Sequence, residues 1–464
     1  MNLIWYTYFG SAQSEFPRDM SILADGSIVV VGSASPQTGL YYPGGLPLST
    51  GVGFILRMDQ NGNRIWSSYF YQGTAISRVT PLVNGDFIVA GSANDNSNIA
   101  TPGSQQTSSA GGGDIFLTRI TPSGEVVWSR YFGGPDEESL NAMVYDGGYI
   151  YCAGNTRSNS GIAFNTTEGG TFIGGDFDAL LVKFDEDGNV IKSRYFGGEG
   201  FDSFNGIAAA NGSLALTGRS DSASGINHGS HILLDGPEPD NATFIASFSD
   251  DLEIQWSTYH DQDGSTLDIL IDTYNRVWVS GRTSSVTDFE FGSGTTHGGD
   301  ADGFIARFQP NGELEMCGYY FSAELNDQIN SLDSDGTNLF VAGLTLSQDL
   351  TVSEDAWQPE HAGSSDGLIM RFALPVGVDE MADLSVSPVY PNPAVDQLTI
   401  PASAMTGVQE LHVCDLTGRS VLHQSAHLPG VATLHITSLQ PGMYTIRAHN
   451  AAGQAVWVQR WVKG

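Results

Sequence analysis

The sequence predicts an all-β protein, a six-bladed β-propeller followed by a small Ig-like β-sandwich. Three observations lead to this fold class. Short phrases rich in β-branched and aromatic residues recur through residues 1–374, and tight turn sequences separate them. Residues 388–464 then differ in charge and in patterning from everything before them. We therefore expect a propeller over 1–374, a linker over 375–387 and a sandwich over 388–464.

An aromatic phrase occurs six times at spacings of 60 to 64 residues. Its copies are WYTYF at Trp5, WSSYF at Trp66, WSRYF at Trp128, KSRYF at Lys192, WSTYH at Trp256 and MCGYY at Met316. Two other phrases keep step with it, such as SIVVVGS (27–33) and GFILRM (53–58). These runs are short and bounded by turn residues, so each predicts a strand.

Turn sequences join the phrases into units of four antiparallel strands, which we name A to D. Sequences such as ADGS lie between strands A and B, and QNGN or PSGE lie between C and D. The aromatic phrase is strand D. FDEDGN (184–189) looks like a calcium loop, but its repeat equivalents MDQNGN and ITPSGE indicate a hairpin turn.

The phasing of the repeats predicts how the ring closes. The chain begins with a strand D that has no A, B or C before it, and its repeats end with GLIMRF (367–372), a strand C with no D after it. We expect the first strand to complete the last blade, so that six blades form a closed ring. Truncation of residues 1–9 should then destabilise the last blade.

Charge and composition exclude several classes of function. The net charge is -33, which is far from that of a protein that binds nucleic acid or an anionic membrane. Residues 388–464 carry a net charge of +1 and residues 1–387 a net of -34 (15 basic against 49 acidic side chains), which marks two units of different origin. Three scattered cysteines show neither zinc spacing nor a disulfide framework. No stretch is long and apolar enough to span a membrane.

The repeats of residues 1–374 resemble a known family. The pattern WSxYFGG, a DGxIYVAGxT-like strand and GGxDAFLxKF is similar to the bacterial β-propeller repeat called SBBP. That resemblance implies seven blades, whereas this chain shows six phrases. Either the ring has six blades or a further blade precedes Met1. The family carries no catalytic residues that could be transferred.

The tail resembles the C-terminal sorting domain of Bacteroidetes proteins that use type IX secretion. It has the YPNP opening, the D-x-x-G-R turn, the L-x-P-G-x-Y strand and a lysine near the end. The corresponding residues are Tyr390, Pro391, Asn392, Pro393, Asp415, Gly418, Arg419, Leu439, Pro441, Gly442, Tyr444 and Lys463. The resemblance implies partnership with the type IX machinery, and a secreted protein or one anchored on the outer-membrane surface. It also implies a signal peptide; none is visible after Met1, so we expect a start upstream of it.

The long connections are the candidate binding surface. Each joins strand B to strand C, and B–C and D–A connections emerge on one face of a propeller. They span residues 34–52, 93–113, 157–177, 221–242, 284–302 and 346–366. Within them Tyr41, Tyr42 and Trp357 could stack on a sugar. The alternative is that these loops only pack on neighbouring blades.

Acidic residues gather in the D–A connections. The candidate ligand-binding residues there are Asp136, Glu138, Asp202, Asp263 and Asp327. Should they converge at the channel mouth, they could hold Ca²⁺ or attract a cationic partner. The alternative is a solvated acidic rim. The aspartates that open strand C recur in register, which predicts a structural role such as a loop hydrogen bond; they are Asp114, Asp178, Asp302 and Asp366.

No catalytic motif is present in the sequence. GxSxG, HExxH and phosphate-loop patterns are absent, and His228 and His231 are interpreted as surface residues with no metal. The leading hypothesis is an exported, non-enzymatic, monomeric propeller that binds a glycan, protein or surface ligand through its B–C loops. The alternatives are a secreted hydrolase or lyase with its site at the channel mouth, and a structural component of the cell surface.

Overall fold

The computed structural model describes most of the chain. The described residues are 5, 7–10, 14–34, 40–46, 52–71, 73–93, 99–234, 236, 242–261, 264–284, 300–321, 325–348, 358, 360–361, 363–374, 390, 394–400, 408–414, 420–425, 432–440, 442–449 and 455–463. The chain divides into two compact units, Met1–Arg371 and Phe372–Gly464. Within the described part, no helix has the length and apolar character needed to cross a membrane.

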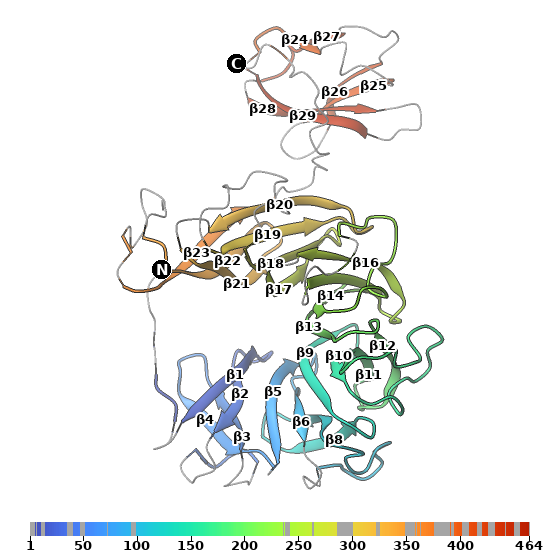
Figure 1. Cartoon of the computed structure of the whole chain (residues 1–464). Helices are drawn as coiled ribbons and strands as arrows, with labels where there is room; N and C mark the ends of the chain where they lie inside the picture. Colours follow the sequence, from blue (N-terminus) through green and yellow to red (C-terminus); the bar gives the residue numbers. More distant parts are fainter. Residues whose placement is uncertain are drawn as a thin grey trace. The chain divides into compact units, whose positions relative to one another are not determined.

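The first unit is built from antiparallel sheets that follow one another along the chain (Figure 1). Sheet 1 contains β1 (Glu15–Ile22), β2 (Ile28–Ala34), β3 (Gly53–Met58) and β4 (Arg64–Tyr69). Sheet 2 contains β5 (Thr74–Pro81), β6 (Phe87–Ala93), β7 (Asp114–Ile120) and β8 (Val126–Phe132). Sheet 3 contains β9 (Glu138–Asp146), β10 (Tyr149–Thr156), β11 (Asp178–Asp185) and β12 (Val190–Phe196).

Three further sheets complete this series. Sheet 4 contains β13 (Asp202–Ala210), β14 (Ser213–Ser220), β15 (Ala242–Ser249) and β16 (Ile254–Asp261). Sheet 5 contains β17 (Ser265–Ile271), β18 (Val277–Thr283), β19 (Asp302–Phe308) and β20 (Leu314–Phe321). Sheet 6 has three strands among the described residues, β21 (Asp327–Ser334), β22 (Asn338–Thr345) and β23 (Asp366–Ala373).

These sheets confirm the predicted four-strand unit. In sheets 1 to 5 the strands pair in the order A, B, C, D, and the aromatic phrase is strand D. Strand A of each sheet contacts strand A of the next, from β1 and β5 through to β17 and β21. Such serial packing of four-stranded antiparallel sheets is that of β-propeller blades. The number of blades and the closure of the ring stay predictions.

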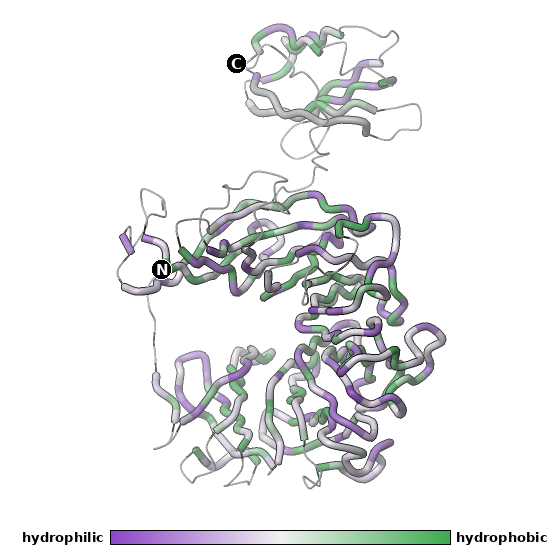
Figure 2. The backbone as a smooth tube through the Cα atoms, in the orientation of Figure 1, coloured by the Kyte–Doolittle hydropathy of each residue, from purple (hydrophilic) through white to green (hydrophobic). Residues whose placement is uncertain are grey.

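Strand C is buried along all or nearly all of its length in sheets 1 to 5. Every residue of β3 and β19 is buried, because strand C lies between B and D within its sheet and neighbouring sheets cover both faces. Figure 2 shows hydrophobic stretches running through many of these strands, with hydrophilic stretches at many of the turns. A repeated aromatic pair joins the cores of adjacent sheets. Phe70, at the end of the sheet 1 phrase, stacks on Phe116 in β7, with ring centroids 5.4 Å apart.

Where strand D carries a tryptophan, this residue binds its sheet to the next one. Its indole Nε1 donates a 2.9 Å hydrogen bond to a backbone carbonyl in the C–D turn of the next sheet. The acceptor is the second residue of that turn. The pairs are Trp66 to Pro122, Trp128 to Glu186 and Trp256 to Pro310. A turn carbonyl at a blade junction needs a hydrogen-bond donor, which explains the preference for tryptophan at this position of strand D.

A basic residue of strand C donates to the same turn carbonyl. Arg57 Nη1 lies 2.8 Å from the Pro122 oxygen, and Arg119 Nη1 lies 3.1 Å from that of Glu186. Lys183 Nζ donates to the equivalent Asp250 oxygen over 2.7 Å. Each of these contacts therefore joins two residues that lie more than sixty positions apart.

A glycine in the C–D turn makes room for the tryptophan. Gly188 adopts a φ of +77°, and a Cβ added there would lie 2.8 Å from the Trp128 ring. Where the sequence replaces tryptophan with Lys192, the next turn replaces glycine with Leu252, at a φ of +57°. Lys192 instead forms an ion pair with Glu253. Glycine and tryptophan thus change together across the junction.

The first copy of the phrase contacts sheet 1 in the same way. Trp5 Nε1 donates to the Gln60 carbonyl over 2.9 Å, and a Cβ on Gly62 would lie 2.8 Å from the Trp5 ring. The Phe9 ring lies 5.2 Å from that of Phe54, which occupies the strand C position of Phe116. Trp5 and Phe9 therefore stand against sheet 1 where a preceding strand D would stand.

The second unit contains two sheets that share one hydrophobic core. One pairs β24 (Gln397–Ile400) with β27 (Ala432–His435). The other has the order β26 (Ser420–Ser425), β25 (Glu410–Cys414), β28 (Gly442–His449) and β29 (Ala455–Lys463). Leu398 and Leu434 from the first sheet cluster with Leu411, Val413 and Ile446 from the second, all fully buried. An Ig-like arrangement of this sandwich stays a prediction. The predicted linker over 375–387 lies outside the described residues.

The packing of tryptophan on the turn glycine can be tested with two substitutions. Alanine strains the backbone at any positive φ, by about 1–3 kcal/mol. At Gly188 it also meets the Trp128 ring, whereas Gly85 has a φ of +94° and no atom within 4 Å of an added Cβ. Gly188→Ala should lower the free energy of unfolding by about 1–2 kcal/mol more than Gly85→Ala. Urea denaturation followed by tryptophan fluorescence measures both, and equal midpoints would contradict the packing role.

Candidate functional site

In sheets 1 to 4 the described parts of the B–C connections fold back along the outer strand of their own sheet. A loop residue forms a backbone bridge to the serine of the aromatic phrase, and that serine's hydroxyl donates to a second loop carbonyl. The bridges are Tyr42 to Ser67, Phe164 to Ser193 and His228 to Ser257, and the hydroxyls donate to Leu40, Ile162 and Ile226. Strand D is the outer edge of its sheet, and the loop supplies partners for backbone groups that an edge strand exposes.

The tyrosine of the phrase holds the start of the same connection. Tyr195 Oη donates to the Ser158 carbonyl over 2.8 Å, and Tyr259 Oη donates to the carbonyl of Ser222. In sheet 2 the Ile99 amide donates to Tyr131 Oη. Burial raises the pKa of Tyr259 to about 12, so its hydroxyl remains a donor. Serine and tyrosine together fix the described loops against the blades.

In sheets 1, 3 and 4 this anchoring presents a ring at the bridging loop position, whereas sheet 2 has Thr101 there, whose amide donates to the Ser129 carbonyl. Tyr42, Phe164 and His228 each follow the same path beside strand D, and all three are exposed. The exposed fractions of Tyr42 and Phe164 are 43% and 45%, and the predicted site residue Tyr41 is 39% exposed. The Arg64 guanidinium lies over the Tyr42 ring, 4.3 Å from its centroid. We call Tyr42, Phe164 and His228 the loop rings. Trp357, the remaining aromatic candidate, lies outside the described residues.

Most of the acidic candidates are buried. Glu138, Asp202 and Asp327 have exposed fractions of 1% or less, whereas Asp136 is exposed and Asp263 lies outside the described residues. Each buried carboxylate is the first residue of strand A. Hydroxyls near the end of strand B donate to it, as Thr156 does to Glu138 over 2.6 Å and Ser222 does to Asp202 over 2.8 Å.

Each buried carboxylate faces the aspartate that opens strand C of the preceding sheet. The pairs are Glu138 with Asp114, Asp202 with Asp178, and Asp327 with Asp302. Burial raises the pKa of Glu138, Asp202 and Asp327. The pairs lie at three different blade junctions. Among the described side chains, none of them belongs to a group close enough to share one metal ion. They hold the junctions, and among the described acidic candidates only Asp136 has an exposed carboxylate.

The strand C aspartates also make the expected loop hydrogen bonds. Asp114 accepts from the Ala110 amide over 2.9 Å, and Asp178 accepts from the Ile173 amide over 2.8 Å. Both donors belong to the end of the preceding B–C connection. The hairpin interpretation of FDEDGN is confirmed as well, since Asp185 accepts from the amides of Asp187 and Asn189 within the β11–β12 turn.

Two neighbouring cavities lie between the B–C connection of sheet 4 and sheet 5, of about 250 and 350 Å³. His260 and Cys317 line the smaller one, and both break the repeat, since the phrase has phenylalanine and serine at their positions. Burial lowers the pKa of His260 to about 3 and raises that of the Cys317 thiol. A neutral imidazole and a protonated thiol do not make an activated nucleophile.

In the second unit, residues from both ends of the sorting pattern meet. Tyr390 forms a backbone bridge with Thr399, and Ala394, which follows Pro393, forms a parallel bridge with Lys463. Gly442 pairs with Lys463 between β28 and β29, and Tyr444 Oη donates to the Gln440 carbonyl over 2.9 Å. The other residues of the pattern lie outside the described part. These are Pro391, Asn392, Pro393, Asp415, Gly418, Arg419 and Pro441.

One group of potential ligands was missed by sequence reasoning. Glu410 and His412 on β25 and His423 on β26 place three ligand atoms within 4.8 Å of one another. The signal that could have found them is the pattern E-x-H on one predicted strand and a histidine on the next. Their meeting depends on the register between the two strands.

Comparisons with known proteins identify the second unit. Residues 388–463 match the family described as the secretion system C-terminal sorting domain. No curated protein matches the chain. The matching domain indicates type IX secretion, a secreted or cell-surface location, and interaction with the type IX machinery.

Solved structures show weaker likenesses. PorZ, an essential surface component of the type IX secretion system of Porphyromonas gingivalis, is 14% identical with a TM-score of 0.37, over 98% of this chain and 53% of PorZ. The chain thus spans about half the length of PorZ. A protein of unknown function from Dyadobacter fermentans is 11% identical with a TM-score of 0.39, over 79% and 97%. A virginiamycin B lyase from Staphylococcus aureus is 12% identical with a TM-score of 0.32, over 72% and 94%. We draw no function from likenesses of this strength.

The Asp178–Asp202 pair predicts a pH dependence of stability. Burial, with a contribution from the Asp202 charge, raises the pKa of Asp178 from 3.8 to about 6. The folded protein therefore holds this proton more tightly than the unfolded chain does. The stabilisation is complete below about pH 4 and is lost as the pH rises through about 6.

Asp178→Asn imitates the protonated carboxyl. It should remove this part of the pH dependence and raise the free energy of unfolding above about pH 7 by about 1–3 kcal/mol. Urea denaturation midpoints between about pH 4 and 8 measure the effect. Asp136→Asn, at an exposed position, is the control and should leave the profile unchanged. A profile of Asp178→Asn that runs parallel to that of the unaltered protein would refute the assignment.

Proposed function

We propose that this chain is a non-enzymatic cargo of type IX secretion whose SBBP-type propeller binds an extracellular glycan through its B–C connections. The sorting domain supplies the location, and the propeller supplies the binding surface. The observation that carries the proposal is the repeated, exposed placement of the loop rings. A protein ligand is the alternative outcome of the test below.

The loop rings are suited to a repetitive ligand. Tyr42, Phe164 and His228 occupy one position in sheets 1, 3 and 4, with Thr101 at that position in sheet 2 between them. The serine and tyrosine anchors hold the loop backbone, which reduces the conformational entropy lost on binding. Aromatic faces offer apolar contact to the hydrogen-bearing faces of sugar rings without needing a charged ligand. The acidic pairs do not compete for this role, because they are buried at the blade junctions.

A glycan array probed with the full chain tests this function, with a peptide array as the second arm. Tyr42→Ala and Phe164→Ala should each weaken binding to the captured glycan by about fivefold or more, with little change in stability because the rings are half-exposed. Tyr274→Ala is the matched control, since Tyr274 is 47% exposed but lies in the A–B turn of sheet 5. The glycan proposal fails if nothing binds above background, if only peptides bind, or if all three variants bind equally.

We also propose that the propeller is a closed ring of six blades. Three contacts support this proposal: Trp5 on the Gln60 carbonyl, Trp5 against Gly62, and Phe9 on Phe54. Each repeats a contact between successive sheets, so Trp5 and Phe9 stand where residues of a preceding strand D would stand. Sheet 6, with β21 to β23, has no strand D among the described residues. Pairing of residues 5–9 with β23 would complete it.

Tyr8 provides the test of closure. Its equivalents Tyr69 and Tyr195 are buried. Tyr8 is 98% exposed, and residues 7–10 are not part of a strand in this structure. In a closed ring Tyr8 would pack against the B–C connection of sheet 6. Tyr8→Ala should then lower the free energy of unfolding by about 2–4 kcal/mol, as expected for loss of a buried aromatic side chain. If the denaturation midpoint of Tyr8→Ala equals those of the unaltered protein and of Tyr274→Ala, the proposal of a closed ring is wrong.

A further inference from the structure

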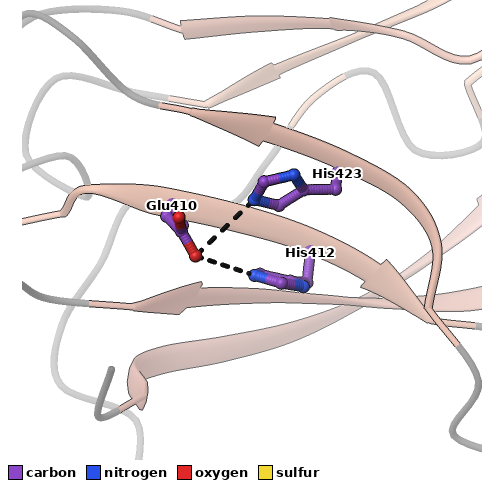
Figure 3. Close-up of side chains that lie close together, drawn as sticks. All are labelled: Glu410, His412 and His423. Carbon is purple, nitrogen blue, oxygen red and sulfur yellow. Dashed lines mark hydrogen bonds and ion pairs between the residues drawn. The ribbon is translucent and has the colours of Figure 1, made fainter. Parts of the chain in front are cut away.

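Three side chains with metal-binding groups meet on the sheet of the second unit (Figure 3). Glu410 and His412 alternate along β25, and His423 lies directly opposite His412 on β26. The Nε2 atom of His412 lies 3.3 Å from Glu410 Oε2, and that of His423 lies 3.6 Å from the same oxygen. Two imidazoles and one carboxylate therefore point at a common volume.

Strand alternation explains why they share a face. Leu411 and Val413 are fully buried in the core, so Glu410 and His412 between and beside them face outward. Directly opposite residues on antiparallel strands lie with Cβ atoms about 5 Å apart, which brings the two imidazoles together. Their ring centroids are 4.5 Å apart. All three side chains are accessible to solvent, so an ion could enter without any rearrangement of the core.

The two nitrogen-to-oxygen separations are close to those of a tetrahedral zinc site, and all three ligand atoms lie within 4.8 Å of one another. Zinc binds histidine nitrogen and carboxylate oxygen at about 2.0–2.1 Å, so its ligand atoms lie about 3.3 Å apart. The two measured nitrogen-to-oxygen distances differ from that value by a few tenths of an ångström at most. Two histidines and a carboxylate with one position left to water is a known ligand set for this ion. Hard cations such as Ca²⁺ and Mg²⁺ prefer oxygen ligands and fit this set poorly.

We propose that Glu410, His412 and His423 bind a zinc ion on the outer face of the sorting domain. The ion would bridge β25 and β26. Because β26 is the edge strand of its sheet, a ligand from each strand would fasten the edge to the interior. The register also places His449 of β28 opposite Glu410 and Arg447 opposite His412.

Zinc titration of the full chain with a competing chromophoric chelator tests the site. We expect one site per chain whose affinity falls by at least about tenfold in His412→Ala and in His423→Ala. Glu410→Gln should weaken binding as well, and the double histidine variant should lose the site. The matched control is His435→Ala, because His435 is an exposed histidine of the same unit on the other sheet. It should bind zinc as the unaltered protein does.

Hydrogen exchange measured by mass spectrometry gives a second, local readout. Zinc should slow exchange of the β26 amides in the unaltered protein and in His435→Ala, but not in the double variant His412→Ala/His423→Ala. The same experiment with Mg²⁺ should leave β26 unchanged. Zinc affinity or β26 protection that survives the double substitution would overturn the proposal. The proposal would also be overturned if the unaltered protein bound zinc no more tightly than the double variant. The cluster would then be only a surface hydrogen bond between Glu410 and His412.

Discussion

The first unit depends on one carbonyl group in each C–D turn. The oxygens of Pro122 and Glu186 each accept two donors from the preceding sheet, an indole N–H and a guanidinium. A polar group at such a junction must be satisfied, and the donors lie roughly one repeat earlier in the chain. The order of the blades follows from this, because each sheet carries the donors that the next one requires.

The residues of the aromatic phrase make contacts of two kinds, with the following sheet and with the B–C connection of their own sheet. Tryptophan and the final phenylalanine contact the following sheet, while serine and tyrosine hold the B–C connection of their own sheet. Four positions of one short strand thus set both the blade junction and the course of the loop. The buried carboxylate pairs belong to the same junctions, with hydroxyls of strand B as their donors. The proposed glycan site therefore lies apart from these junctions, on the outer surface of the described loops.

The second unit is held together by different interactions. Its core is apolar and shared between two sheets, and residues from its two ends meet at the bridge between Ala394 and Lys463. Its net charge is close to neutral, whereas residues 1–387 are strongly acidic. Half of the histidines of the chain lie in it. Its outward face is therefore where nitrogen ligands gather, although the sorting pattern itself contains none.

The sequence by itself determined the four-strand unit, the turns and the sorting domain. Strand alternation and turn chemistry are local properties, and every repeat shows the same pattern. The sequence offered Glu138, Asp202 and Asp327 as candidate ligands or as part of a solvated acidic rim, and the tertiary structure buries their side chains. Burial there depends on an aspartate in the preceding sheet and hydroxyls on the next strand, which no local pattern reports. The same holds for His412 and His423, eleven positions apart in the chain. Only the register of two strands made them neighbours, since register is decided by which faces pack into the core.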